Sequence, residues 1–447
     1  MGLYPCMEKC NAHNSDGLRR ASILRPFRNR ALASASLSRS FLVSVAVYLC
    51  LGIIYLLFSP NYDWQSHRHD DVYGADYLQE WVGARLILDG HADELYSSKF
   101  LDWQHDPELI GFEWDKGQFY PAVYPPPHYV LFAPLALLSY RWSAIVWLMI
   151  LLASACLAAW TITSTVKHGT EKTDQPARIE CDYLWIGALL FPSMLFSVTL
   201  GQKSAVWLLL LSVTAYLLLN SKDYLSGFVF GLLTVKPTLC FLLPLLMLKE
   251  KRWRFLAGMT TSCLLLWGTS AAFLPWSVWP AFADGFRSAG NYAENAGYRM
   301  EWSCNLLTFA YGLTPELVPW CKWGVCLLLG IYVFFGAITD SMDWKNPRKW
   351  MIIATSTVLL SPHFYHYDLC ILLVPILWLI ATEPRRGFAY FAMLSIGVVL
   401  AGDVVTHLRL PILPLILVGI VSELRLSGVL HGSRQYRSYR LKNAIGG

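Results

Sequence analysis

Apolar runs separated by short polar turns make up most of the chain after residue 125. Several runs are shorter than the ~20 residues that a straight membrane crossing needs, so neighbouring helices must shield them or the membrane must thin. The pattern predicts an all-α polytopic membrane protein with roughly 10–13 membrane-embedded helices. The candidate spans are Pro126–Ser139, Ala144–Thr163, Tyr183–Leu200, Ser204–Asn220, Tyr224–Leu248, Phe255–Leu274, Trp323–Thr339, Met351–Leu360, Leu369–Ala381, Gly387–Gly402 and Leu410–Leu424.

Composition points to the same class. The 447 residues are 55% hydrophobic and 15% charged, with a mean hydropathy of +0.40, which is too apolar for a soluble protein of this size. The eleven cysteines are scattered without a Cys-x-x-Cys pair. They read as small core hydrophobes, not as a disulfide framework or a zinc site.

Charge is sorted along the chain, which predicts the topology. Residues 1–40 carry seven Lys/Arg and two acidic residues directly before the apolar run Phe41–Phe58, so the positive-inside rule places the N-terminus in the cytoplasm. The basic lead is long and Ser59-Pro60 is a poor cleavage site, which favours a retained span over a cleaved signal peptide. Residues 60–125 carry thirteen Asp/Glu and four Lys/Arg and are expected to form an outer loop.

Basic turns mark the opposite, cytoplasmic side, at Lys249–Arg254, Lys345–Lys349, Arg385-Arg386 and in the tail at Arg425, Arg434, Arg437, Arg440 and Lys442. Pro280–Glu301 and Ser361–Asp368 then fall on the outer side. We therefore expect a cytoplasmic segment at 1–40, a single membrane domain at 41–424 and a cytoplasmic tail at 425–447.

The outer loop contains a predicted helix that begins near Asp76. Large and small apolar residues recur there at helical spacing, at Tyr77, Trp81, Ala84 and Leu88. Asp76 and Gln79 resemble a capping box, and Gly90 is typical of a helix end. The pattern predicts an amphipathic helix on the membrane surface.

Lys236 is a cation inside a mostly apolar stretch, Tyr224–Leu248. In a single kinked span it would lie at mid-membrane, at a cost of about 2.5–3.5 kcal/mol on insertion scales. In a hairpin of two half-length helices it would face outward, and Pro237 favours this hairpin by interrupting the helix. A lysine suits a phosphate as a point charge, although it could also simply extend to the membrane interface.

Two further polar motifs border predicted spans. Tyr124–Tyr129 reads Tyr-Pro-Pro-Pro-His-Tyr, which is a rigid helix entry or part of a binding site. Gly201-Gln202-Lys203-Ser204 is either a turn or a set of hydrogen-bond donors placed at a head-group or sugar.

Ser361–Asp368 gathers two histidines, His363 and His366, with two tyrosines and a carboxylate. Two histidines could indicate a metal site, but the sequence does not supply three clearly placed ligands. A histidine that donates to a leaving phosphate oxygen needs no metal. An interfacial aromatic belt is the simpler alternative.

These motifs, and the order in which they follow one another along the chain, resemble those of one protein family. They are Asp76 to Tyr96 with its Ala-Arg-hydrophobic helix, Tyr124-Pro125-Pro126, Gly201-Gln202, Gly231 to Pro237 before Lys251–Arg254, and Ser361-Pro362-His363 with Tyr367-Asp368. The chain resembles glycosyltransferase family 87, the polyprenol-phosphate-mannose-dependent α-mannosyltransferases of the GT-C fold. The resemblance covers roughly Asp76 to Ile380.

The resemblance implies an inverting hexosyltransferase that acts at the outer face of the cytoplasmic membrane, with mannose as the expected sugar. It implies that Asp76 is the general base and His363 a second catalytic residue. The residues expected to bind the donor phosphate or substrate are Lys236, Gln202, Tyr124, His366 and Arg85. Two features depart from the family pattern: Asp70-Asp71 offers a rival carboxylate, and Lys203 stands where a smaller or apolar residue is more usual.

The residue chemistry is compatible with a lipid-phosphate donor. The chain has no Gly-rich phosphate loop and no dinucleotide-binding motif. We expect a polyprenyl-phosphate sugar, a lipid or glycan acceptor and membrane lipids as partners, and no nucleic acid, metal or cofactor. A transporter or flippase for a lipid-linked solute is the alternative, although the two similar halves common in transporters are not found. A scaffold role would leave Lys236 and His363 without a purpose.

Overall fold

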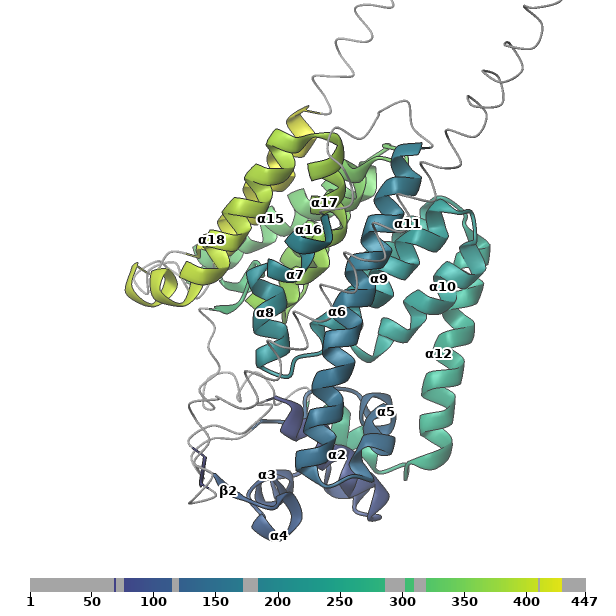
Figure 1. The fold of residues 1–447 in the computed structure, drawn as a ribbon, viewed down its shortest axis with the longest axis vertical. Helices are drawn as coiled ribbons and strands as arrows, with labels where there is room; N and C mark the ends of the chain where they lie inside the picture. The colour runs from purple at the N-terminus through teal and green to yellow at the C-terminus, as the bar shows by residue number, and fades with distance from the viewer. Residues whose placement is uncertain are drawn as a thin grey trace, which may run out of the picture.

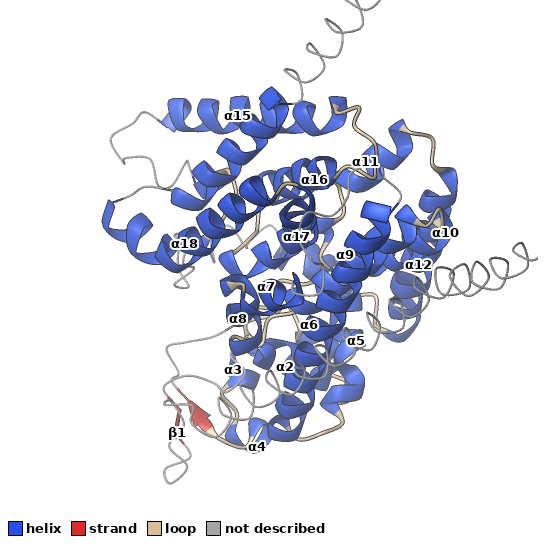
Figure 2. Cartoon of the chain, turned by 45° about the horizontal axis from the view of Figure 1, so that its top comes forward, coloured by secondary structure: helices blue, strands red, loops and turns tan. Residues whose placement is uncertain are grey.

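A computed structural model describes residues 68–69, 76–114, 120–171, 184–285, 302–308, 319–408 and 411–427. The predicted first span Phe41–Phe58, the basic segment 1–40, the Asp70-Asp71 pair and tail residues 428–447 lie outside the described residues. Within the described residues the protein is helical apart from two short strands, as the pattern of apolar runs predicted (Figures 1 and 2).

The elements before the apolar part are short. They are β1 (Arg68–His69), α2 (Tyr77–Leu88), the 3-10 helix η1 (Ala92–Glu94), α3 (Lys99–Gln104), α4 (Pro107–Ile110) and β2 (Glu113–Trp114). The two strands pair in parallel and lie at the edge of the molecule (Figure 2).

Helices follow in close succession from residue 126. They are α5 (Pro126–Ala136), α6 (Tyr140–Glu171), α7 (Leu184–Leu190), α8 (Pro192–Thr199), α9 (Ser204–Leu219), α10 (Asp223–Gly231), η3 (Leu232–Val235), η4 (Pro237–Leu239), α11 (Leu242–Lys249), α12 (Trp253–Phe273), α15 (Pro319–Thr339), α16 (Pro347–Leu360), η6 (His366–Leu372), α17 (Leu373–Thr382) and α18 (Pro384–Leu408). Residues 278–285 and 412–427 are also helical.

Helix α6 runs through the middle of the molecule. It carries 32 residues and packs against α9 along much of its length. One end meets α2 and α5, and the other end reaches toward α17 (Figure 1). The long helix therefore connects the two ends of the protein.

Two of the described helices are long and apolar enough to cross a membrane, namely Tyr140–Thr170 and Trp253–Phe273. Shorter apolar helices of 10–17 residues lie at Ser204–Leu219, Asp223–Val235, Trp323–Thr339 and His366–Thr382. Short helices of this kind need neighbouring protein around them if they lie in a membrane.

The predicted single span Tyr183–Leu200 is wrong in one respect, because it is two helices. Phe191 adopts an extended conformation before Pro192, and α8 begins at that proline. A residue before proline is biased away from the helical conformation, which explains the break. The predicted span Leu369–Ala381 similarly begins inside a 3-10 helix, η6, before α17 takes over.

The prediction of an amphipathic surface helix at Asp76 is also corrected. Helix α2 is buried on all sides over most of its length, including Gln79 and Glu80. It packs on α5, where Gly83 admits the Tyr129 ring, since a β-carbon there would lie 2.4 Å from that ring. The side chain of Asp76 makes no capping hydrogen bond, so the expected capping box is absent, whereas the helix does end just before Gly90.

The hairpin at Lys236 is confirmed. Two 3-10 turns separate α10 from α11, and Lys236 stands between them. Helices α10 and α12 run side by side in the same direction, because Gly227 meets Phe255 and Gly231 meets Met259. The chain between them, which includes α11, must therefore run in the opposite direction. Lys236 lies at the tip of this hairpin, where its side chain is buried in protein.

Glycines allow the backbones of α10 and α12 to touch. A β-carbon at Gly227 would lie 1.9 Å from the Phe255 carbonyl oxygen, and one at Gly258 would lie 2.0 Å from that of Tyr224. Gly227 and Gly231 are four residues apart, the spacing that small residues use in close helix pairs within membranes. This contact fixes the position of the hairpin against α12.

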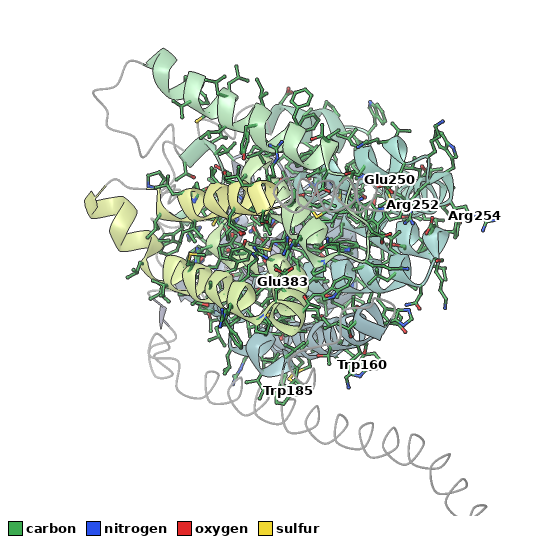
Figure 3. The ribbon with its side chains drawn as sticks, turned by 90° about the horizontal axis from the view of Figure 1, so that it is seen from above. Trp160, Trp185, Glu250, Arg252, Arg254 and Glu383 are labelled. Carbon is green, nitrogen blue, oxygen red and sulfur yellow. The ribbon has the colours of Figure 1, made fainter. Side chains whose placement is uncertain are left out.

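Within the described residues, the basic turns predicted to be cytoplasmic gather at the end of the molecule opposite α2, where Figure 3 labels Arg252 and Arg254. Lys349 Nζ lies 2.8 Å from Glu250 Oε1, and Arg348 binds Glu383 with two hydrogen bonds of 2.7 Å. Arg386 pairs with Glu423 at 2.8 Å. These pairs connect the ends of α11, α16, α17 and the last helix.

Candidate functional site

A buried carboxylate, Glu80, lies one turn after Asp76 on α2. It is 0% exposed and pairs with two groups from distant parts of the chain, Lys203 and His128. These partners satisfy one carboxylate oxygen each, Lys203 Nζ at Oε1 and His128 Nε2 at Oε2. Burial alone would raise the pKa of Glu80, but His128 and Lys203 outweigh it and hold that pKa below its ordinary value. Glu80 is therefore ionised at neutral pH.

Lys203 reaches Glu80 from the loop between α8 and α9. The loop is fixed by Gly201, whose φ is +66°, by a 2.8 Å hydrogen bond from Trp147 Nε1 to the Gly201 carbonyl, and by the pairing of Ser197 with Gln202. The Lys203 ammonium also lies 3.9 Å from the centroid of the Tyr124 ring. A cation over an aromatic face is attracted to the ring, most strongly where water is excluded.

Tyr124 continues the same cluster toward α5. Its ring stacks on His128 with centroids 4.1 Å apart, and its carbonyl accepts a 2.7 Å hydrogen bond from the Tyr96 hydroxyl. Tyr124 and His128 both belong to the Tyr-Pro-Pro-Pro-His motif, whose prolines begin α5. The motif is thus both a helix entry and part of the polar cluster.

A second buried ion pair lies beside the first. Lys236 Nζ is 2.6 Å from Asp368 Oδ2. Ser204, which directly follows Lys203, donates a 2.6 Å hydrogen bond to Asp368 Oδ1. Ser204 and Lys203 thereby connect the Lys236–Asp368 pair to the Lys203–Glu80 pair through one stretch of backbone.

His363 lies on the extended segment between α16 and η6. Residues 303–306 hold this segment: Cys304 N–H donates to the Phe364 carbonyl at 2.8 Å, and Asn305 Nδ2 donates to the Pro362 carbonyl at 2.8 Å. Burial lowers the pKa of His363 to about 4, and Lys236 contributes to the lowering. The imidazole is therefore neutral at pH 7, and one ring nitrogen carries a proton that can be donated to an acceptor.

Asp76 is the half-buried carboxyl of the cluster. Desolvation raises its pKa to about 7; Lys203 opposes this, whereas Glu80 and Asp368 add to it. The same two groups, Lys203 and Asp368, also act on His363. Asp76 and His363 are 287 residues apart in the sequence. Together with Lys236 they nevertheless belong to one polar cluster inside an apolar helical protein.

The structure does not bring every predicted site residue to this cluster. Arg85 lies near the other end of α2, where it pairs with Asp89 at 2.8 Å and donates to the Ala136 carbonyl. His366 is buried, but its ring faces Phe196 and Trp302. Gln202 is buried in the loop beside Lys203, and its backbone groups bond to Ser197.

Four members of the cluster were not among the predicted site residues: Glu80, His128, Lys203 and Asp368. Each carried a signal, because Glu80 is a charge in the middle of an apolar helix and the other three stand in motifs that were singled out. What the sequence does not contain is the pairing, since 123 residues separate Lys203 from Glu80. Among the described residues no group of three or more His, Cys, Asp or Glu side chains could hold a metal ion.

An apolar pocket lies among the helices around the Lys236 hairpin. It is lined by residues of η4, η6 and the helices around them, including Leu239, Leu243, Ile353, Thr357 and Ile371. Leu239 follows Lys236 by three residues, and Ile371 follows Asp368 by three. The pocket is therefore close in sequence to both members of the pair, although neither of them lines it.

The family model described as glycosyltransferase family 87 matches residues 122–362, a little over half of the chain. The match is narrower than the expected range of Asp76 to Ile380. It contains Tyr124, Lys203 and Lys236, begins after Asp76 and ends one residue before His363. A search of curated proteins finds no match to the chain.

Proposed function

The chain belongs to glycosyltransferase family 87, and we propose that it transfers a hexose, mannose by preference, from a polyprenyl-phosphate sugar to a lipid or glycan acceptor. The proposed fold is of the GT-C type, with the reaction at the outer face of the cytoplasmic membrane. The observation that carries the proposal is the convergence of Asp76, Lys236 and His363 on one polar cluster. Family membership favours this enzyme over the alternative of a lipid transporter.

In the proposed reaction the acceptor hydroxyl oxygen attacks the anomeric carbon of the donor sugar. The bond between that carbon and the phosphate oxygen breaks, and polyprenyl phosphate leaves with the bonding electrons. The attack comes from the face opposite the departing phosphate, so the anomeric configuration inverts, and Asp76 takes the proton of the attacking hydroxyl. A general base works best when its pKa lies near the working pH, and the pKa of Asp76 is raised to about 7.

Lys236 and His363 are the proposed partners of the donor phosphate. A lysine ammonium is a compact cation with three donors, so it can approach a phosphate oxygen without leaving Asp368 entirely. His363 is neutral because its pKa is lowered to about 4, so it offers the phosphate an N–H hydrogen bond and no proton transfer. The leaving phosphate needs charge stabilisation, which donors placed in a water-poor site supply well.

The apolar pocket among the helices around the Lys236 hairpin supports a lipid-linked donor. Its lining is almost entirely apolar, as a site for part of a lipid chain requires. The basic turns gathered at the end opposite α2 support an outer-facing site, because basic turns prefer the cytoplasmic side.

The direct test is transfer by the purified protein in lipid nanodiscs. Polyprenyl-phosphate mannose with a labelled sugar, and a membrane lipid extract as acceptor, should give free polyprenyl phosphate and a labelled glycolipid. The same donor carrying glucose tests the hexose, and Asp76→Asn serves as the inactive control. Movement of intact donor across sealed vesicles, without release of polyprenyl phosphate, would overturn the proposal in favour of a transporter.

A further inference from the structure

Lys203 is the residue that departs from the expected family pattern, and the structure places its side chain in the middle of the candidate site. The residue is 1% exposed. Its ammonium touches Glu80 and the face of Tyr124. A buried lysine is costly unless it is paired, so a cation in this loop requires the carboxylate that α2 provides.

We propose that Lys203 is a positioning residue for Asp76: held between Glu80 and Tyr124, its ammonium keeps the neighbouring Asp76 in the ionised form that accepts a proton. The inference rests on the proposed role of Asp76 as general base. It assigns to Lys203 a role in preparing the base, not in contacting the donor.

The geometry of α2 brings the two carboxylates to one side. Asp76 and Glu80 are four residues apart, so they lie above one another on the same helix face. Glu80 is the inner of the two and is fully buried, whereas Asp76 is half-buried. Lys203 binds the inner carboxylate, and its charge also acts on the outer one.

The charged and titratable groups that face Asp76 come from several elements. Lys203 favours its ionised form, and Glu80 and Asp368 disfavour it. Burial raises the pKa of Tyr124 and of Tyr367, and the nearby Asp76 charge adds to both increases. Among these groups Lys203 is the only cation, which makes it the residue that offsets two neighbouring carboxylates.

Glu80 affects Asp76 in two opposite ways. It fixes Lys203 in place, but its negative charge also disfavours ionisation of Asp76. His128 binds the second oxygen of Glu80, so the carboxylate is held toward α5 and cannot rotate freely. Lys203 and Glu80 therefore act on Asp76 with opposite signs, and His128 only holds Glu80 in place.

The test measures protonation of Asp76 without measuring catalysis. A hydrophobic carbodiimide adds to protonated carboxyls and rearranges to a stable acylurea, which peptide mass spectrometry locates by residue. The midpoint of Asp76 labelling against pH is measured on the full chain in nanodiscs. The proteins compared are the wild type, Lys203→Met, Lys203→Arg and the double variant Lys203→Met/Glu80→Gln.

Lys203→Met should move the midpoint upward by about 1 pH unit or more, since an opposite charge within ~4–6 Å lowers a carboxyl pKa by about 1–3 units. Lys203→Arg keeps the cation and should stay near the wild type. The double variant removes a cation and an anion together, so its midpoint should fall between the wild type and Lys203→Met. It also avoids an uncompensated buried charge, which keeps the test usable if Lys203→Met fails to fold.

Two results would overturn the inference: an unchanged midpoint in folded Lys203→Met, or a double-variant midpoint at or below the wild type, which would make Glu80 the stronger influence. The matched control is Lys222→Met, an exposed lysine beyond the other end of α9, which should change nothing. Failure of the proposed function is distinguishable, because it would appear as full transfer by Asp76→Asn whatever the labelling midpoints are.

Discussion

The Lys236 ammonium lies 2.6 Å from the Asp368 carboxylate, and the two side chains are only 5% and 2% exposed. Asp368 is held further by Ser204 Oγ and by the Tyr365 N–H. A phosphate that arrives at Lys236 must therefore share this cation with Asp368 or displace it. The pair explains how a lysine can lie deep among apolar helices before any donor binds.

Removal of Lys236 should separate stability from donor binding. Lys236→Met should lower the free energy of unfolding by about 3–5 kcal/mol, because it leaves Asp368 as an uncompensated buried charge. The double variant Lys236→Met/Asp368→Asn should recover most of that stability, yet donor binding should remain weak. Thermal unfolding and donor binding on the same nanodisc samples check both parts, and tight donor binding by the double variant would contradict the role of Lys236.

Asp76→Asn should fold normally and lose nearly all transfer. The side chain caps no helix, so an amide in its place should leave the stability of α2 unchanged. Loss of a general base typically slows a reaction by roughly 10²–10⁴-fold. The matched control is Asp93→Asn, an exposed acid of the same loop region, which should keep wild-type turnover. If Asp76→Asn retains more than about a tenth of that turnover, the base lies elsewhere.

The pH dependence should follow the ionisation of Asp76. Its pKa is raised to about 7, and only the ionised form accepts a proton, so kcat/KM should rise with pH and level off above about 7. Below that value it should fall by roughly tenfold for each pH unit. His363, with a pKa lowered to about 4, stays neutral over this range and adds no second limb. A profile that is flat down to about pH 5.5 would be inconsistent with this base.

Replacement of His363 should slow turnover more than it weakens donor binding. A hydrogen bond that strengthens as the phosphate leaves contributes to kcat more than to KM. His363→Ala removes the N–H, whereas His363→Gln keeps a donor and should restore part of the rate. Steady-state kinetics with varied donor concentration separate the two constants. Equal losses in kcat and donor affinity would make His363 a residue that only orients the donor.

Gly227→Ala should disrupt the contact between α10 and α12. Its β-carbon would lie 1.9 Å from the Phe255 carbonyl oxygen, so the helices must separate, at a cost of about 1–3 kcal/mol or more. Gly268→Ala, on α12, is the matched control, because a β-carbon there meets nothing within 4 Å. Unfolding in detergent compares the two variants. Equal stability of the two variants would contradict a direct contact between the two backbones.

Much of the helical pattern could be predicted from hydropathy. The runs Ser204–Asn220 and Phe255–Leu274 correspond to α9 and α12 within about two residues at each end, the usual uncertainty of helix ends. The hairpin at Lys236 followed from one proline. The break before Pro192 was missed, because the apolar run continues across it and hydropathy alone does not register a change of direction.

Some members of the candidate site could be predicted from the sequence, whereas its other members and all of its connections could not. Asp76, Lys236 and His363 were expected to act on one substrate, and the structure places them in one cluster. Gln202 was chosen over its neighbour Lys203, although the lysine is the side chain that reaches Glu80. Which side chain of a loop points inward depends on backbone angles such as the positive φ of Gly201, and these depend on tertiary contacts that a single sequence does not contain.

The glycine contact between α10 and α12 determines which parts of the site can move. Because the two backbones touch, the Lys236 hairpin can shift only together with α12, as one rigid unit. His363 lies instead on an extended segment outside any helix, joined to residues 303–306 by hydrogen bonds. Because this segment leads to Asp368, the partner of Lys236, we expect a donor to meet the lysine as a fixed cation.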